Sequence, residues 1–172
     1  MNRKFSKGAL IKAALVCVIA SQSALARGEE PVAPVSSEEG QIWLTTGFFS
    51  HHMNRKKDFN ETNTGLGVEY TLSRSTAVAI GHYENSVYKP STYLHFVYTP
   101  LELGALQLGG AVGLLNGYPA LREGRFAPVV LPIGRVNFKL FNQDVGVNFT
   151  YIPTIGSRID GAVAIQFRLR VW

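Results

Sequence analysis

Apolar residues alternate with polar or small ones along most of this chain from about residue 41 onward. In residues 65–72 one side of the run is apolar, and the other side carries Gly67, Glu69 and Thr71. This period of two is typical of a β-strand with one apolar and one polar face. The same alternation in residues 41–50 predicts that Leu44 and Phe48 share one face, opposite Trp43, Thr45, Gly47 and Phe49.

The pattern predicts about eight strands and no helix in the mature chain. Their expected ranges are 41–50, 65–72, 76–84, 92–99, 105–115, 129–138, 144–152 and 161–172. In a bilayer a β-sheet can hydrogen-bond all of its backbone groups only if it closes into a barrel. An even number of strands with one apolar and one polar face therefore favours a barrel. We therefore predict an all-β fold, an eight-stranded antiparallel up-and-down transmembrane β-barrel. A secreted soluble barrel or sandwich is the alternative.

The first forty residues have a different character. Residues 1–26 join a basic start to a short apolar run and end in Ser23-Ala24-Leu25-Ala26, the order found in a secretory signal peptide. Residues 27–40 are acidic and contain prolines, which predicts a flexible periplasmic leader. The barrel is then expected over residues 41–172.

Removal of this signal changes the charge and the cysteine content. It takes away Arg3, Lys4, Lys7 and Lys12 and no acid, so the formal charge falls from +5 to +1. The low remaining charge removes the main argument for a nucleic-acid partner, which is a strongly basic chain. Cys17 leaves with the signal, so the mature chain has no thiol, disulfide or cysteine metal site.

The connections between the predicted strands differ in length. Residues 51–63, 85–91, 116–128 and 153–160 are expected at one end, and the mostly shorter 73–75, 100–104 and 139–143 at the other. Long outer loops and short inner turns are usual in outer-membrane barrels.

Two of the outer connections carry candidate chemistry. One is the junction at residues 81–91, which contains Glu84, Asn85 and Ser86, and the other contains His51 and His52. A histidine base and a serine hydroxyl at the mouth of an apolar tube are suited to acyl transfer. Gly109, Ala111, Gly113 and Gly146 are small residues expected to face the lumen, where they could leave room for one acyl chain. The alternative is an interior filled by other side chains, as in most small barrels.

Several segments resemble the PagP family of outer-membrane enzymes, which move a palmitoyl chain from a phospholipid to lipid A. Residues 128–132 (PVVLP) and 147–153 (VNFTYIP) resemble that family's PVLLP and TYIP segments. Phe59-Asn60-Glu61, followed by Gly65 and Gly67, resembles its YNE and glycine-rich run. The resemblance covers most of the mature chain.

The resemblance implies a catalytic serine at Ser86 and a histidine at His52, with His51 as the alternate. His52 is preferred because it is closer to the following loop. The family's acid falls on Asn85, which departs from the pattern because an amide cannot hold an imidazolium as a carboxylate does. Glu84, Asp58 or Glu61 then takes that part, or the chemistry is altered or lost. In that family, prolines interrupt the hydrogen bonding between strands and let a lipid tail enter the barrel sideways. The resemblance places this lateral entry at Pro132 and Pro153, since proline cannot donate a hydrogen bond to the neighbouring strand.

Cations are frequent in the predicted outer loops: Arg55, Lys56, Lys57, Lys89, Arg122, Arg125 and Arg158. They are suited to the phosphates of lipid A, although rim loops of any outer-membrane barrel carry cations for the same lipids. His82 and His95 lie within strands, where we expect satisfied lumen or girdle groups. We predict neither metal nor cofactor.

We predict a monomeric bacterial outer-membrane protein that transfers an acyl chain from phospholipid to lipid A, with outer-membrane lipids as its partners. His52 is expected as the base, Ser86 as nucleophile or aligning hydroxyl, and Asn85 as a hydrogen-bonding partner. The alternatives are a lipid A deacylase and a non-enzymatic structural or surface-modifying barrel.

Overall fold

The structure is a computed structural model that describes residues 39–156 and 158–172. The predicted signal peptide and nearly all of the predicted leader lie outside these residues. Among the described residues no helix is long and apolar enough to cross a membrane.

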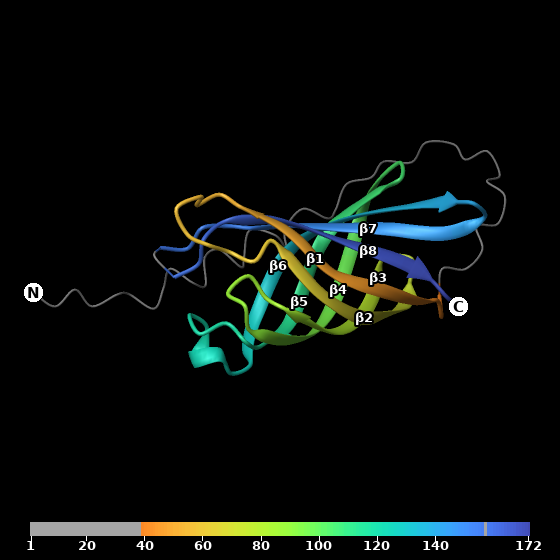
Figure 1. The fold of residues 1–172 in the computed structure, drawn as a ribbon. Coiled ribbons are helices and arrows are strands. Elements are labelled where there is room, and N and C mark those ends of the chain that lie inside the picture. Colours follow the sequence, from red (N-terminus) through yellow and green to blue (C-terminus); the bar gives the residue numbers. More distant parts are fainter. Residues whose placement is uncertain (1–38, 157) are drawn as a thin grey trace, which may run out of the picture. The chain divides into compact units, whose positions relative to one another are not determined.

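Eight antiparallel strands form a closed barrel in which each strand pairs with its neighbours in sequence and β8 pairs with β1. This confirms the predicted all-β, up-and-down meander (Figure 1). The strands are β1 (Ile42–His52), β2 (Thr62–Ser73), β3 (Thr76–Glu84), β4 (Pro90–Leu103), β5 (Leu106–Leu115), β6 (Ala127–Leu140), β7 (Gln143–Ile152) and β8 (Ala162–Arg170). A short 3₁₀ turn, η1 (Arg122–Gly124), lies between β5 and β6.

The alternation in the sequence becomes the two surfaces of the barrel wall. In β2, Glu69 and Thr71 are buried, whereas the apolar side chains that alternate with them are exposed: Leu66, Val68, Tyr70 and Leu72. The polar and small positions therefore face the lumen, and the apolar positions cover the outside.

A β-bulge changes the predicted alternation in β1. The pairing with β2 shifts between Thr46 and Phe48, and the pairing with β8 shifts between Thr45 and Phe48. Phe48 consequently turns inward and packs on Tyr83 and Tyr93, while Phe49 is exposed. Our placement of Phe48 beside Leu44 was wrong, because a bulge adds one residue and inverts every later side chain in the strand.

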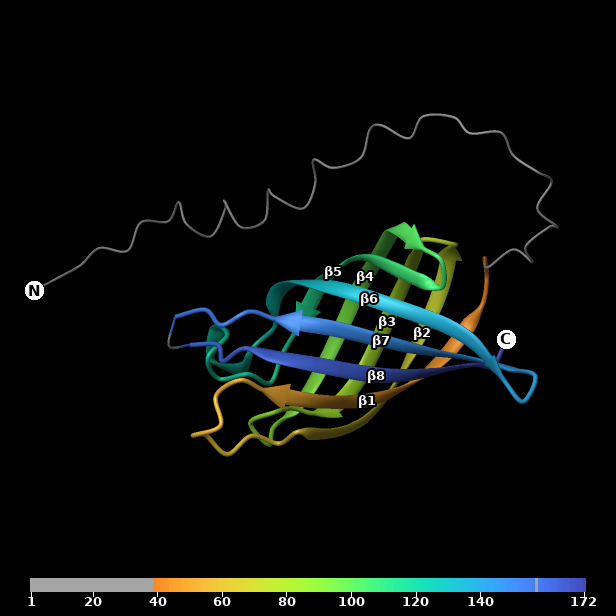
Figure 2. The ribbon, with the colours of Figure 1, turned by 90° about the horizontal axis from the view of Figure 1, so that it is seen from above.

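The two ends of the barrel differ as predicted in the length of their connections (Figure 2). At the long-loop end lie loop 1 (53–61), loop 2 (85–89), loop 3 (116–126) and loop 4 (153–161). At the short-turn end the connections are 74–75, 104–105 and 141–142. All three turns are shorter than expected. Pro100 did not end its strand, because the register shift between Tyr98 and Leu101 accommodates the residue that cannot donate to the ladder.

Side chains fill most of the lumen. Toward the short-turn end, Glu69 pairs with Arg135 and Arg168, and the Arg168 guanidinium lies 4.6 Å from the centre of the Trp43 ring. Midway along the barrel, Gln166 Nε2 donates to the Tyr93 hydroxyl at 3.2 Å and Asn148 Nδ2 donates to Gln166 Oε1. The sequence left open whether the interior is filled, and in the structure side chains fill much of it around a cavity.

Candidate functional site

Asn60 joins the first two loops at the long-loop end. Its backbone N–H donates to the Ser86 carbonyl at 3.0 Å, and its side-chain amide donates to Glu84 Oε2 and the Asn85 carbonyl. The two segments that the sequence singled out therefore lie side by side. The sequence had given Asn60 no role beyond its place in a resembling motif.

Asn85 is completely buried and uses its whole amide to hold the loops. Its Nδ2 donates to Ser91 Oγ at 2.9 Å and to the Gly117 carbonyl at 2.8 Å. Its Oδ1 accepts from the backbone N–H groups of Val87 and Lys89. Asn85 thus shapes loop 2 and links it to loop 3, and within the described residues no hydrogen bond joins it to His51 or His52 of β1.

His52 is the last residue of β1 and is buried at the rim. Its ring stacks on Phe59 with the centroids 4.0 Å apart. Its Nδ1 lies 3.7 Å from Glu61 Oε1, which is just outside hydrogen-bonding distance. His51 points to the outside, and its Nδ1 lies 3.8 Å from the same oxygen. Of the acids that the sequence left open, Glu61 is the one beside the imidazoles.

A backbone donor and a cation contact Glu61. The backbone N–H of His52 donates to its Oε1 at 2.9 Å, and Arg55 Nη1 lies 2.5 Å from the same atom. The hydrogen bond from the His52 backbone, followed by that from Arg55, holds the pKa of Glu61 below its ordinary value. Glu61 is therefore ionised at neutral pH and able to stabilise an imidazolium.

Ser86 and Glu84 are held near this group through Asn60. Ser86 is half-buried, and its hydroxyl makes no hydrogen bond in the described part of the chain. Glu84 is exposed and accepts from the Asn60 amide. The structure thus brings the loops of His52 and Ser86 together without a hydrogen bond between the two side chains.

No known family model matches the chain, and no curated protein sequence is detectably similar to it. What the molecule shows on its own is an eight-stranded antiparallel barrel. The resemblance to the PagP family stays a prediction.

The predicted phosphate-binding cations fall into two groups. Arg55 pairs with Glu61, Lys57 with Asp160 and Arg125 with Glu123, and Arg122 donates to the Phe126 carbonyl. By contrast, the side chains of Lys56, Lys89 and Arg158 make no ion pair with any described residue. The second group is free to meet an external anion.

The β6–β7 seam is the part of the barrel wall with the longest unpaired stretch. The ladder between these strands ends at Ile133 and Thr150, so residues 127–132 of β6 pair only with β5. Pro132 lies at the end of the ladder, where its carbonyl accepts from Thr150 Oγ1. Pro153 follows β7 directly. Both prolines of the predicted lateral entry thus border the unpaired stretch.

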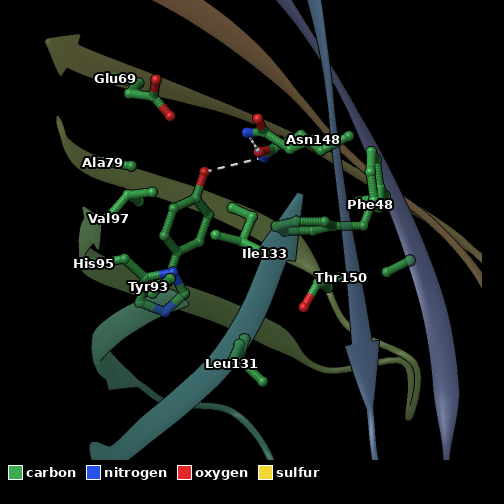
Figure 3. A pocket seen from close by; sticks show the side chains of 14 residues that line it. Phe48, Glu69, Ala79, Tyr93, His95, Val97, Leu131, Ile133, Asn148 and Thr150 are labelled. Carbon is green, nitrogen blue, oxygen red and sulfur yellow. Dashed lines mark hydrogen bonds between the residues drawn. The ribbon is translucent and has the colours of Figure 1, made fainter. Parts of the chain in front are cut away.

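A cavity of about 50 Å³ lies behind the seam. Leu131 and Ile133 of β6 and Phe149 and Thr150 of β7 line it. Figure 3 shows Tyr93 and His95 on one side of this space and Phe48 and Thr150 on the other. The cavity is about a third of the ~150 Å³ that encloses one benzene molecule, so it admits only part of an acyl chain without side-chain movement.

Two features of the interior differ from the expectations drawn from the sequence. His95 lines the cavity, as expected of a lumen group, but its buried Nε2 has no hydrogen-bond partner among the described residues. Glu69, Arg135 and Arg168 form a buried ion cluster that we did not predict. Its signal was present, since each of these charges occupies a lumen-facing position of an alternating strand. Among the described residues, no three groups are placed to hold a metal ion.

Proposed function

We propose that this protein is a bacterial outer-membrane enzyme that moves an acyl chain to, or from, lipid A. The observation that carries the proposal is the β6–β7 seam with the cavity directly behind it. A barrel that is apolar on the outside offers its wall to lipid tails, and an unpaired stretch of wall lets one tail enter sideways.

The loops support access at the same place. Loops 1, 2 and 3 are hydrogen-bonded to one another through Asn60 and Asn85, and loops 1 and 4 through Lys57 and Asp160. Loops 3 and 4 flank the seam, and no hydrogen bond joins them within the described residues. Hydrogen bonds therefore link neighbouring loops around the rest of the rim, whereas none of those between described residues crosses the rim above the seam.

The chemistry is assigned to His52 as general base, with Glu61 stabilising its protonated ring. His52 takes the proton of the attacking hydroxyl, whose oxygen forms a new bond to the acyl carbon as the donor's ester bond breaks. The product is a new ester when the hydroxyl belongs to an alcohol and a carboxylic acid when it belongs to water. The proton returns from the imidazolium to the departing alkoxide. If the attacking hydroxyl belongs to lipid A, the reaction is a transfer, and if it belongs to water, the reaction is a deacylation.

Mass spectrometry of lipid A from cells with and without the protein tests the proposal. A transferase adds the mass of one acyl chain and a deacylase removes one, whereas unchanged lipid A contradicts both. We expect His52→Gln to reduce the product by about 10²–10⁴-fold, the usual contribution of a general base. His82→Gln is the matched control, because His82 is an exposed strand histidine bonded only to Thr92.

Ser86→Ala distinguishes two forms of the mechanism. If Ser86 is the nucleophile, its loss matches that of the His52 variant. If the acceptor hydroxyl attacks directly, as the absence of a His52–Ser86 hydrogen bond favours, Ser86→Ala keeps most of the activity.

A non-enzymatic barrel is the second candidate. The complete use of the Asn85 amide in loop contacts favours it, because the position of the family's acid serves the fold here. Unchanged lipid A together with a correctly inserted barrel is the result expected of this candidate.

A further inference from the structure

The cavity behind the seam contains a polar atom that no protein group satisfies. His95 Nε2 is buried at the cavity wall and has no hydrogen-bond partner. Packing alone positions the ring, whose centroid lies 4.9 Å from that of Tyr93. On its other side Gly113 makes room, because a Cβ there would lie 2.8 Å from His95 Cδ2.

Each of the other polar side chains that line the cavity has at least one hydrogen-bond or ion-pair partner, unlike His95. The Tyr93 hydroxyl accepts from Gln166, and Thr150 Oγ1 donates to the Pro132 carbonyl. Glu69 is paired with two arginines. Asn148 donates through Nδ2 to Gln166, and only its Oδ1 lacks a partner. Much of the remaining lining is apolar, including Val97, Ala111 and Leu131.

An alkyl tail that enters such a cavity displaces water and leaves His95 Nε2 without a partner. A buried polar atom left unsatisfied costs far more than one ordinary hydrogen bond contributes. A hydroxyl on the tail removes this cost in either tautomer of the ring, since it can donate to a bare nitrogen or accept from an N–H.

We propose that the cavity selects long acyl chains that carry a hydroxyl group well down the chain. His95 lies four residues beyond Ser91 along β4, or about 13 Å from the rim at the usual strand rise. A chain whose carboxyl group stays at the rim therefore reaches His95 with carbons far from that group. This inference depends on the proposed acyl-handling function and names its substrate class.

Equilibrium binding to the purified full chain in detergent micelles tests the selectivity. The probes are radiolabelled stearic acid and 12-hydroxystearic acid, with binding to empty micelles subtracted. We expect the wild type to bind the hydroxylated acid about tenfold more tightly, the effect of one satisfied buried hydrogen bond.

Variants locate the effect at one side chain. His95→Phe keeps the packing on Tyr93 and should lose the preference, while His95→Gln should keep part of it. His82→Phe, on the exposed outer face, should keep all of it. Heat-modifiable gel migration shows which variants are folded, and His95→Leu replaces His95→Phe if the latter is not.

The outcomes separate this inference from the function on which it depends. If both acids bind equally to the wild type, the hydroxyl selectivity is wrong. If the preference survives in His95→Phe, its assignment to His95 is wrong. In both cases the acyl site stands. If neither acid binds, both the selectivity and the acyl-holding cavity are wrong.

Discussion

Two groups of interacting charges in the barrel differ in their exposure to solvent and in whether an imidazole is one of their members. The lumen cluster (Glu69, Arg135 and Arg168) is almost entirely shielded from solvent, and both Glu69 oxygens are paired. The rim cluster (His52, Glu61 and Arg55) is partly exposed, and the imidazole there has no hydrogen bond from Nδ1. A buried carboxylate with both oxygens paired to guanidinium groups holds the fold, whereas an imidazole with an unused nitrogen beside an ionised acid is able to take up a proton.

The largest effect on this comparison should come from Glu69→Ala. The substitution leaves two buried guanidinium groups without their shared carboxylate, which should lower the free energy of unfolding by about 3–5 kcal/mol. Urea unfolding of the barrel in lipid vesicles measures the change. Glu102→Ala is the matched control, since the pair between Glu102 and Arg74 is partly exposed and should contribute no more than about 1 kcal/mol. Similar losses in both variants would contradict the distinction.

Asn85→Asp should have the next largest effect and tests the residue that departs from the PagP pattern. A carboxylate at this position cannot donate to Ser91 Oγ or to the Gly117 carbonyl, so one buried and one half-buried acceptor lose their donor. We expect the free energy of unfolding to fall by about 2–3 kcal/mol, with no gain in lipid A modification. A variant of unchanged stability and higher activity would show that position 85 is catalytic.

The smallest expected effect concerns the hydrogen bonds between loops 1 and 4. Lys57 and Asn54 each donate to Asp160, and these two bonds hold its pKa below the ordinary value of 3.8. A depressed pKa means that the interaction stabilises the folded state above that value and is lost as the pH falls through the lower, folded-state pKa. We expect Lys57→Met to raise the pKa of Asp160 toward 3.8 in an NMR titration. An unchanged pKa would mean that Lys57 does not determine it.

Most of the fold could be predicted because the period of two is imposed by the strand itself. The bulge in β1 could not, since it depends on the close approach of Gly47 to β2, where a Cβ would lie 1.9 Å from the Asn63 carbonyl oxygen. Alternation along one strand carries no information about its distance from the next strand.

The sequence was sufficient to predict which chain segments form the candidate site. It was not sufficient to predict which side chains contact one another there. Turn composition and histidine content pointed to loops 1 and 2, which the structure joins through Asn60. The pairing of Asn85 with Ser91 and Gly117, and of His52 with Glu61, depends on which side chains meet across loops. One sequence cannot specify that arrangement.

The closing pair of the barrel has a consequence for how the chain reaches its native state. Seven of the eight strand pairings join neighbours in sequence, but β1 and β8 meet with more than 100 residues between them, as in the Gln166–Thr46 hydrogen bond that spans 120 positions. Local hairpins form quickly, whereas this pairing must wait until β8 has been synthesised and brought back to β1. Until then the sheet has two unpaired edges that can pair with other chains. Protection from self-association is therefore acquired in one late step.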